Sequence, residues 1–227
     1  MGCKPNPEDI AGGQAIIEGV MMRHGNKIAA AVRRPDKEIV FSERSYVPLT
    51  RRYKPLGWMF VRGTVTLFEM MVIGIQFLMF SANVALSEEE KKPQGWEMYV
   101  SLVISFATAI FFFVIVPAFF FTQIKAAVDS LILLNILEGC VRLGMFLCFL
   151  SATLLMADMR RVYMYHGAEH KTVFAWEDGR DLTVENVKKY STRHPRCGTS
   201  FILFVMIVSI VVFSLLGRPD FLHRVAH

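Results

Sequence analysis

The sequence predicts an α-helical integral membrane protein with a small N-terminal antiparallel β unit and a polar, histidine-containing helical insertion. The 227 residues are 53% hydrophobic, include nineteen Phe and have a mean hydropathy of +0.39, which is too apolar for an ordinary soluble domain. Short β-prone runs precede the apolar segments, and one polar segment between apolar runs holds three of the six His. We therefore expect a cytoplasmic β unit in residues 1–62, membrane helices in 63–157, a cytoplasmic His/Cys-rich site segment in 158–198, and a last membrane helix with a short tail in 199–227.

The β unit is predicted from three short runs separated by turn-forming residues. The runs are residues 14–22, 27–33 and 39–44. Glu18 interrupts the first run, between apolar residues on either side. Glu18 is therefore either an outward-facing strand residue or a carboxylate directed at the histidines.

Residues 64–86 form the first apolar segment that is long enough to cross a bilayer, since about 20 helical residues suffice. Four polar residues recur here every seven positions and therefore form one stripe on a helix: Arg62, Glu69, Gln76 and Asn83. A carboxylate at mid-membrane costs roughly 2.5–3.5 kcal/mol, so Glu69 should face protein, a polar cavity or the interface. We prefer a stripe that packs against other helices over one that forms a substrate path.

Three further apolar segments predict helices. Residues 98–121 carry no charge and should form a membrane helix with a kink or an end at Pro117. Residues 124–157 begin with Lys125 and Asp129, which suggests an interfacial start. Residues 199–216 form the last apolar span.

Glu138 and Arg142 lie within the second of these segments, four residues apart. This spacing predicts an ion pair on one helix face, which neutralises two charges near the membrane.

The polar insertion contains the clearest candidate site. His166 and His170 are four residues apart, so both imidazoles should leave the same face of a helix over residues 163–176. Glu169 completes the order His-x-x-Glu-His, in which inverted zinc peptidases use the two His as zinc ligands and the Glu as general base. His194 and Cys197 offer further ligands in a turn-like sequence. The alternative is that these side chains only cap, pair or reach the membrane surface.

Helix signals frame the insertion. Asp178-Gly179 should end the helix that carries the His pair, and Thr183 should cap a short helix that runs to Tyr190.

The net charge of +5 is unevenly distributed, because basic residues crowd 23–62 and 160–196. This pattern favours cytoplasmic placement of both regions and contact with anionic lipids. Membrane lipids are therefore the expected partners. Nucleic acid is not expected, because no aromatic-interleaved binding motif accompanies the charge. Three full crossings between the two basic regions would place them on opposite sides, so we expect residues 64–86 to lie in the interface or in one leaflet.

The four cysteines do not form a paired disulfide framework. Cys3 follows Met1-Gly2, but Asn6 stands where myristoylation requires Ser or Thr, so neither a lipidated start nor a cleaved targeting segment is expected.

Six segments carry a resemblance over nearly the whole chain: GGQAIIEGVMMR (12–23), AVRRP (31–35), RG (62–63), YHGAEHKT (165–172), LTVEN (182–186) and HPRCGTSF (194–201). Together they resemble the YqhQ family of bacterial membrane proteins, a domain of unknown function. The resemblance implies a multi-pass protein of the bacterial inner (plasma) membrane and a metal-dependent enzyme without a known substrate. Family members usually continue into a further membrane segment and a polar tail, so this chain is expected to be short at its C-terminus.

The leading functional expectation is a zinc-dependent hydrolase at the cytoplasmic membrane face. His166 and His170 would bind Zn²⁺ or another divalent transition metal, with His194 or Cys197 as third ligand. Glu169 would take the proton of a metal-activated water.

Other ligands and functions stay open. A carboxylate from Glu18 or Glu185 as third ligand would leave manganese or iron open. A non-catalytic scaffold or regulator with a structural metal site is the main alternative, and a transporter or channel subunit using the polar stripe is a weaker one. A homo-oligomer is also left open.

Overall fold

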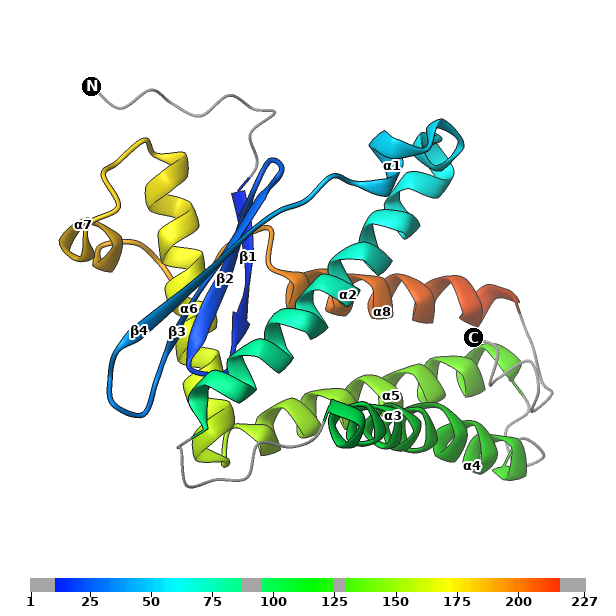
Figure 1. The fold of residues 1–227 in the computed structure, drawn as a ribbon. Coiled ribbons are helices and arrows are strands. Elements are labelled where there is room, and N and C mark those ends of the chain that lie inside the picture. The colour runs from blue at the N-terminus through cyan, green and yellow to red at the C-terminus, as the bar shows by residue number, and fades with distance from the viewer. Residues whose placement is uncertain (1–10, 87–94, 125–129, 217–227) are drawn as a thin grey trace. The chain divides into compact units, whose positions relative to one another are not determined.

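The computed structural model describes residues 11–86, 95–124 and 130–216, which are mostly helical and include one small sheet (Figure 1). Their contacts define two compact units. The first unit comprises the described residues 11–86 and 157–194, and the second comprises 95–124, 130–156 and 195–216.

The sheet of the first unit confirms the predicted antiparallel β unit. Four strands lie in the order β1-β2-β3-β4, with the bounds Ala11–Ile16, Gly19–His24, Lys27–Arg33 and Ile39–Ser45. The prediction of one strand over residues 14–22 is wrong, because Ile17 and Glu18 form a hairpin loop in which Glu18 has φ 50°. Gly19 follows this loop because a Cβ there would lie 2.2 Å from the Ala31 carbonyl oxygen of β3.

Alternation along the strands buries one face of the sheet under α2 (Met59–Ala85). The shared core contains Ile16, Met21, Ile28, Ala30, Val32 and Phe77. Phe77 of α2 is 1% exposed. Helix α2 is therefore a packing partner of the sheet along its second half.

The polar stripe of α2 also contacts this unit. Glu69 accepts a hydrogen bond from the backbone N–H of Leu49 (2.8 Å), at the start of α1 (Leu49–Arg52). Gln76 accepts one from the Arg44 guanidinium (3.2 Å). Glu69 of the stripe thus contacts the start of another helix, as expected, whereas Gln76 contacts Arg44 of strand β4. A short 3₁₀ helix, η1 (Lys54–Gly57), leads into α2.

Helix α6 (Ala157–Glu177) packs against β1 and β2. Adjacent strand residues point to opposite sheet faces, and a Cβ on Gly13 would contact Glu169 of α6, whereas Gln14 contacts α2 at Gly74. The sheet therefore lies between α2 and α6.

The predicted helix end at Gly179 and the predicted cap at Thr183 are confirmed, whereas the short helix ends at Lys188 and not at Tyr190. Gly179 ends α6 with φ 66°, and the Arg180 N–H donates to the Ala175 carbonyl (3.0 Å). Thr183 caps α7 (Val184–Lys188) by accepting a hydrogen bond from the Asn186 N–H (3.4 Å).

The second unit is built from apolar helices: α3 (Gly95–Ile110), the π turn η2 (Phe111–Ile115), α4 (Val116–Ile124), α5 (Leu131–Thr153) and α8 (Gly198–Leu216). Pro117 neither ends the helix nor breaks it, because the wider π turn comes directly before it and accommodates a residue that lacks an N–H. Gly139 lets α5 approach Ile210 of α8, since a Cβ there would lie 2.5 Å from that side chain.

The predicted Glu138–Arg142 pair is present within α5, with 2.6 Å between the carboxylate and guanidinium atoms. The expected interfacial start at Lys125 and Asp129 lies outside the described residues.

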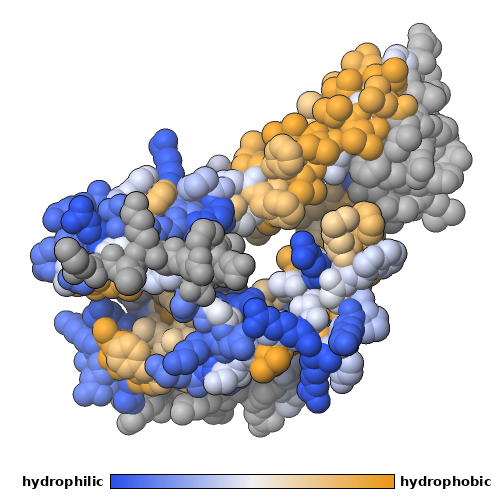
Figure 2. Space-filling view, turned by 90° about the horizontal axis from the view of Figure 1, so that it is seen from above, coloured by the Kyte–Doolittle hydropathy of each residue, from blue (hydrophilic) through white to orange (hydrophobic). Residues whose placement is uncertain are grey.

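Three helices in the described part of the chain are long and apolar enough to cross a membrane: Met59–Ala85, Tyr99–Ile124 and Ile132–Thr153. Many of their large apolar side chains are exposed. Figure 2 shows one large hydrophobic region, together with smaller hydrophobic patches between hydrophilic residues.

Candidate metal centre

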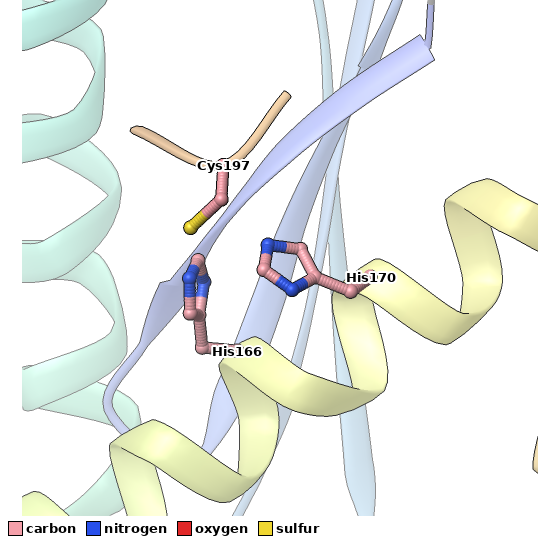
Figure 3. Close-up of side chains that lie close together, drawn as sticks. All are labelled: His166, His170 and Cys197. Atoms are coloured by element: carbon pink, nitrogen blue, oxygen red, sulfur yellow. The ribbon is translucent and has the colours of Figure 1, made fainter. Parts of the chain in front are cut away.

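The two predicted histidines lie on one face of α6, as their spacing requires. The ring centroids of His166 and His170 are 4.2 Å apart, and a ring nitrogen of each lies within 4.8 Å of the other (Figure 3). His170 is buried and His166 is half-buried. Two imidazoles at this separation can bind a single metal ion.

The orientation of His170 is held by the chain that follows α7. Its Nδ1 lies 2.6 Å from the carbonyl oxygen of Thr192. A carbonyl only accepts, so Nδ1 carries the hydrogen, and in the neutral ring Nε2 keeps its lone pair. This hydrogen bond is the type that orients metal-binding histidines in proteins.

The Glu169 carboxylate lies between the two rings. Its Oε2 is 3.1 Å from His166 Nδ1 and 3.9 Å from His170 Nε2. This oxygen is buried and makes no hydrogen bond of good geometry within the described part of the chain. A buried carboxylate oxygen is costly without a proton donor or a cation, so its position fits a bound ion or a polarised water.

His194 lies beside this pair but turns toward a different carboxylate. Its ring centroid is 5.8 Å from that of His170 and 4.3 Å from that of Phe174. Its Nε2 is 3.5 Å from Glu177 Oε2. The structure thus brings His194 next to His170 with its Nε2 near Glu177.

Cys197 follows His194 by three residues and is buried in the second unit, where its Sγ lies 2.8 Å from Thr199 Oγ1. Three residues span at most about 11 Å. The covalent chain therefore keeps this thiol close to His194.

The structure pairs Glu18 with Arg161 and not with an imidazole. The Arg161 guanidinium donates to both carboxylate oxygens of Glu18, and the Tyr165 hydroxyl donates to one of them (3.3 Å). The hydrogen bonds from Arg161 hold the pKa of Glu18 below its usual range. Glu18 therefore forms an ion pair with Arg161 of α6. Glu185, the other carboxylate considered as a third ligand, lies in the first turn of α7.

Arg161 was missed as a site residue, because the sequence indicated it only as part of the basic region 160–196. The available signal was a carboxylate inside a β-prone run, which needs a cationic partner once it is removed from water.

Taken together, the described residues place two imidazoles and a buried carboxylate on one helix, in a donor set that suits zinc and related divalent metals. The chemistry such a set supports is activation of a water molecule beside a general base.

Comparison with known proteins adds the family. Residues 58–227 match the model "Protein of unknown function (DUF1385)". The chain is also 36% identical over 238 residues to "Uncharacterized protein YqhQ" of Bacillus subtilis (strain 168), covering 94% of this chain and 71% of that protein. No solved structure matches the chain. The chain therefore belongs to the DUF1385 family of proteins of unknown function, as the resemblance to YqhQ predicted.

Proposed function

We propose that this protein is a metal-dependent hydrolase of the bacterial cell membrane, with its site on the cytoplasmic face. The observation that carries the proposal is the position of Glu169 Oε2, buried without a good hydrogen bond in the described residues and 3.1 and 3.9 Å from two imidazole nitrogens. A purely structural role for Glu169 would normally supply a protein donor for this oxygen.

His166 and His170 are the proposed metal ligands. Thr192 supports this role for His170, because its carbonyl holds Nδ1 and leaves Nε2 for the metal. For the third ligand we propose His194, because its ring lies beside that of His170 within the first unit, with 5.8 Å between the ring centroids. Imidazole ligands beside a carboxylate suit zinc and related divalent metals.

A divalent metal bound here would polarise a water molecule and lower its pKa. Glu169 is placed to accept the proton of that water, because its Oε2 faces the same space as the two imidazoles. The His170–Thr192 hydrogen bond keeps the ligand ring in place during proton transfer. Membrane lipids and the peptides that border the membrane are the substrate classes within reach of such a site.

The contacts of the first unit support the proposed placement in the membrane. This unit contains both the sheet and α6, so we place both on the same side of the bilayer. The apolar helices Tyr99–Ile124 and Ile132–Thr153 then cross twice and return the chain to that side. Helix α2 packs on the sheet and exposes its other face, as expected for a helix in the interface. The basic residues of this unit support its proposed placement on the cytoplasmic side.

Metal content of the detergent-purified full chain, measured by plasma mass spectrometry, tests the metal site. We expect about one metal per chain in the wild type and its loss in the double variant His166→Ala/His170→Ala. His24→Ala is the matched control, because this imidazole is exposed and lies outside the pair, so it should keep its metal. Absence of stoichiometric metal in the wild type after reconstitution with zinc, manganese and iron would remove the proposal.

The second candidate is a non-catalytic scaffold with a structural metal clip, favoured by the burial of His170, Glu169 and His194. Structural sites fill all four positions with protein ligands, whereas catalytic sites keep one open. Glu169→Gln separates the two: in the enzyme it should retain the metal and lower hydrolysis of lipid or peptide substrates by about 100-fold or more. If wild-type protein with bound metal hydrolyses none of these substrates, the structural clip is the better account.

A further inference from the structure

A second candidate site lies on the other side of α6 from the histidines. A pocket of about 720 Å³ opens between the β3–β4 loop, the end of α2 and the first turns of α6. Arg161, Tyr165 and Ala168 line it at i, i+4 and i+7, and therefore share a helix face that differs from the face of His166 and His170. The volume is in the range of small-ligand sites.

The pocket has an excess of positive charge. Four cations line it: Arg33, Arg34, Lys37 and Arg161. Two carboxylates oppose them, because Glu18 lies in the lining and Asp36 lies 3.6 Å from Arg34. Arg161 pairs with Glu18, Arg34 pairs with Asp36, and Arg33 also attracts Glu18 electrostatically. The four cations still outnumber the two carboxylates, so the pocket attracts an anion through Arg33 and Lys37.

The loop that carries these cations has a defined backbone. The Arg34 N–H donates to the Glu38 carbonyl (2.8 Å), and the Lys37 N–H donates to the Arg34 carbonyl (3.0 Å). Lys37 has a φ of 72°, in the left-handed region of the backbone. The backbone that carries the cations is therefore ordered before a ligand arrives, which reduces the entropy cost of binding.

The rest of the lining is apolar. Pro35 of the β3–β4 loop, Ala85 at the end of α2, and Met164 and Ala168 of α6 supply it. Ala85 is the last residue of α2, and α6 begins at Ala157, shortly after the end of α5 at Thr153. In the membrane placement proposed above, both walls of the pocket reach the level of the lipid headgroups.

We propose that this pocket binds the phosphate group of an anionic phospholipid. The phosphate would contact Arg33 and Lys37, and the glycerol and upper acyl carbons would contact the apolar wall. The inference rests on the proposed membrane placement but not on the metal site, since the two sites use different faces of α6.

Lipid retention by the full-length protein in detergent, counted by native mass spectrometry, tests the inference. The probes are phosphatidylglycerol, phosphatidylcholine and inorganic phosphate. We expect the wild type to retain phosphatidylglycerol in preference to phosphatidylcholine, and Arg33→Gln/Lys37→Gln to bind it about 10- to 30-fold more weakly. Lys188→Gln/Lys189→Gln is the matched control, because it removes the same charge from α7 of the same unit and should bind as the wild type does.

Each outcome decides a separate point. Equal weakening in both double variants would overturn the pocket in favour of diffuse electrostatic attraction. Inorganic phosphate bound as tightly as the lipid would overturn the lipid as the source of the phosphate. Arg33→Lys/Lys37→Arg keeps both charges and should restore binding, which separates charge loss from misfolding. Metal content is measured on the same samples. Loss of lipid binding with the metal retained would count against the lipid pocket alone, and absence of the metal would count against the proposed hydrolase.

Discussion

Gly13 lies on β1 where the strand passes directly beside Glu169. A Cβ at this position would lie 2.6 Å from the Met21 carbonyl oxygen and 2.8 Å from Glu169 Cγ, so Gly13→Ala must displace the carboxylate or the strand. We expect this variant to lower the free energy of unfolding by about 1–3 kcal/mol. It should also lower the metal content, because Glu169 would shift relative to the two imidazoles. Chemical denaturation and plasma mass spectrometry measure the two effects.

Gly12→Ala is the control for that prediction. It adds the same methyl group one residue earlier, where nothing lies within 4 Å of the new Cβ. Its stability and metal content should match the wild type. Equal losses in both variants would show that the strand, and not the contact with Glu169, is sensitive to substitution.

At this same scale, the sequence was sufficient where the geometry is local. The four-residue spacing of His166 and His170 predicted that they share a helix face, and the ring centroids lie 4.2 Å apart. The bond between His170 and the Thr192 carbonyl could not be predicted, because it joins a helix to a loop 22 residues away through a backbone atom. The pairing of Glu18 with Arg161 spans 143 residues and depends on the packing of β1 and β2 against α6.

Helix α2 has two apolar faces with different roles. Phe77 lies in the core with Ile16 and Val32 and is 1% exposed, whereas Phe68 is 58% exposed. Phe77→Ala should lower the free energy of unfolding of the first unit by about 3–5 kcal/mol, because it leaves a cavity between the helix and the sheet. Phe68→Ala removes the same atoms from the outer face and should change this free energy little. Thermal unfolding in detergent compares the two, and similar losses would contradict the packing of α2 on the sheet.

Helices and strands were predicted well where the apolar residues recur at a regular helical or strand spacing. They were predicted less well where a tight loop or a π turn interrupts that spacing. The run around Glu18 resembled one strand because the loop lacks the Asn-Gly or Asp-Gly signal of a two-residue hairpin. Glu18 adopts φ 50° without being Gly, and its ion pair with Arg161 holds it there. The kink or helix end at Pro117 was predicted from the proline alone. The π turn that precedes it has no signal in the sequence and could not be predicted.

For the whole molecule, the apolar segments alone left the topology ambiguous. Three full crossings between the two basic regions would separate them, yet the structure places the sheet and α6 in one unit. His24 of β2 contacts Trp176 of α6, with 5.1 Å between ring centroids. Segments in contact cannot lie on opposite sides of a bilayer, so the proposed placement requires an even number of crossings between them. No pattern in the sequence could supply this constraint, because it arises from contacts between distant segments.

Cysteine labelling in bacterial cells that express the chain tests this topology. In a background without Cys3, Cys140 and Cys148, Asn26→Cys and Arg180→Cys place thiols at exposed positions of the first unit. A membrane-impermeant maleimide should label both only after the cells are permeabilised, because both positions are expected on the cytoplasmic side. Ser130→Cys precedes α5 and is also exposed, so it should react in intact cells. Labelling of positions 26 and 180 from opposite sides would mean that α2 crosses the bilayer, which its packing on the sheet opposes. Labelling of both from outside would instead reverse the orientation that the basic residues predict.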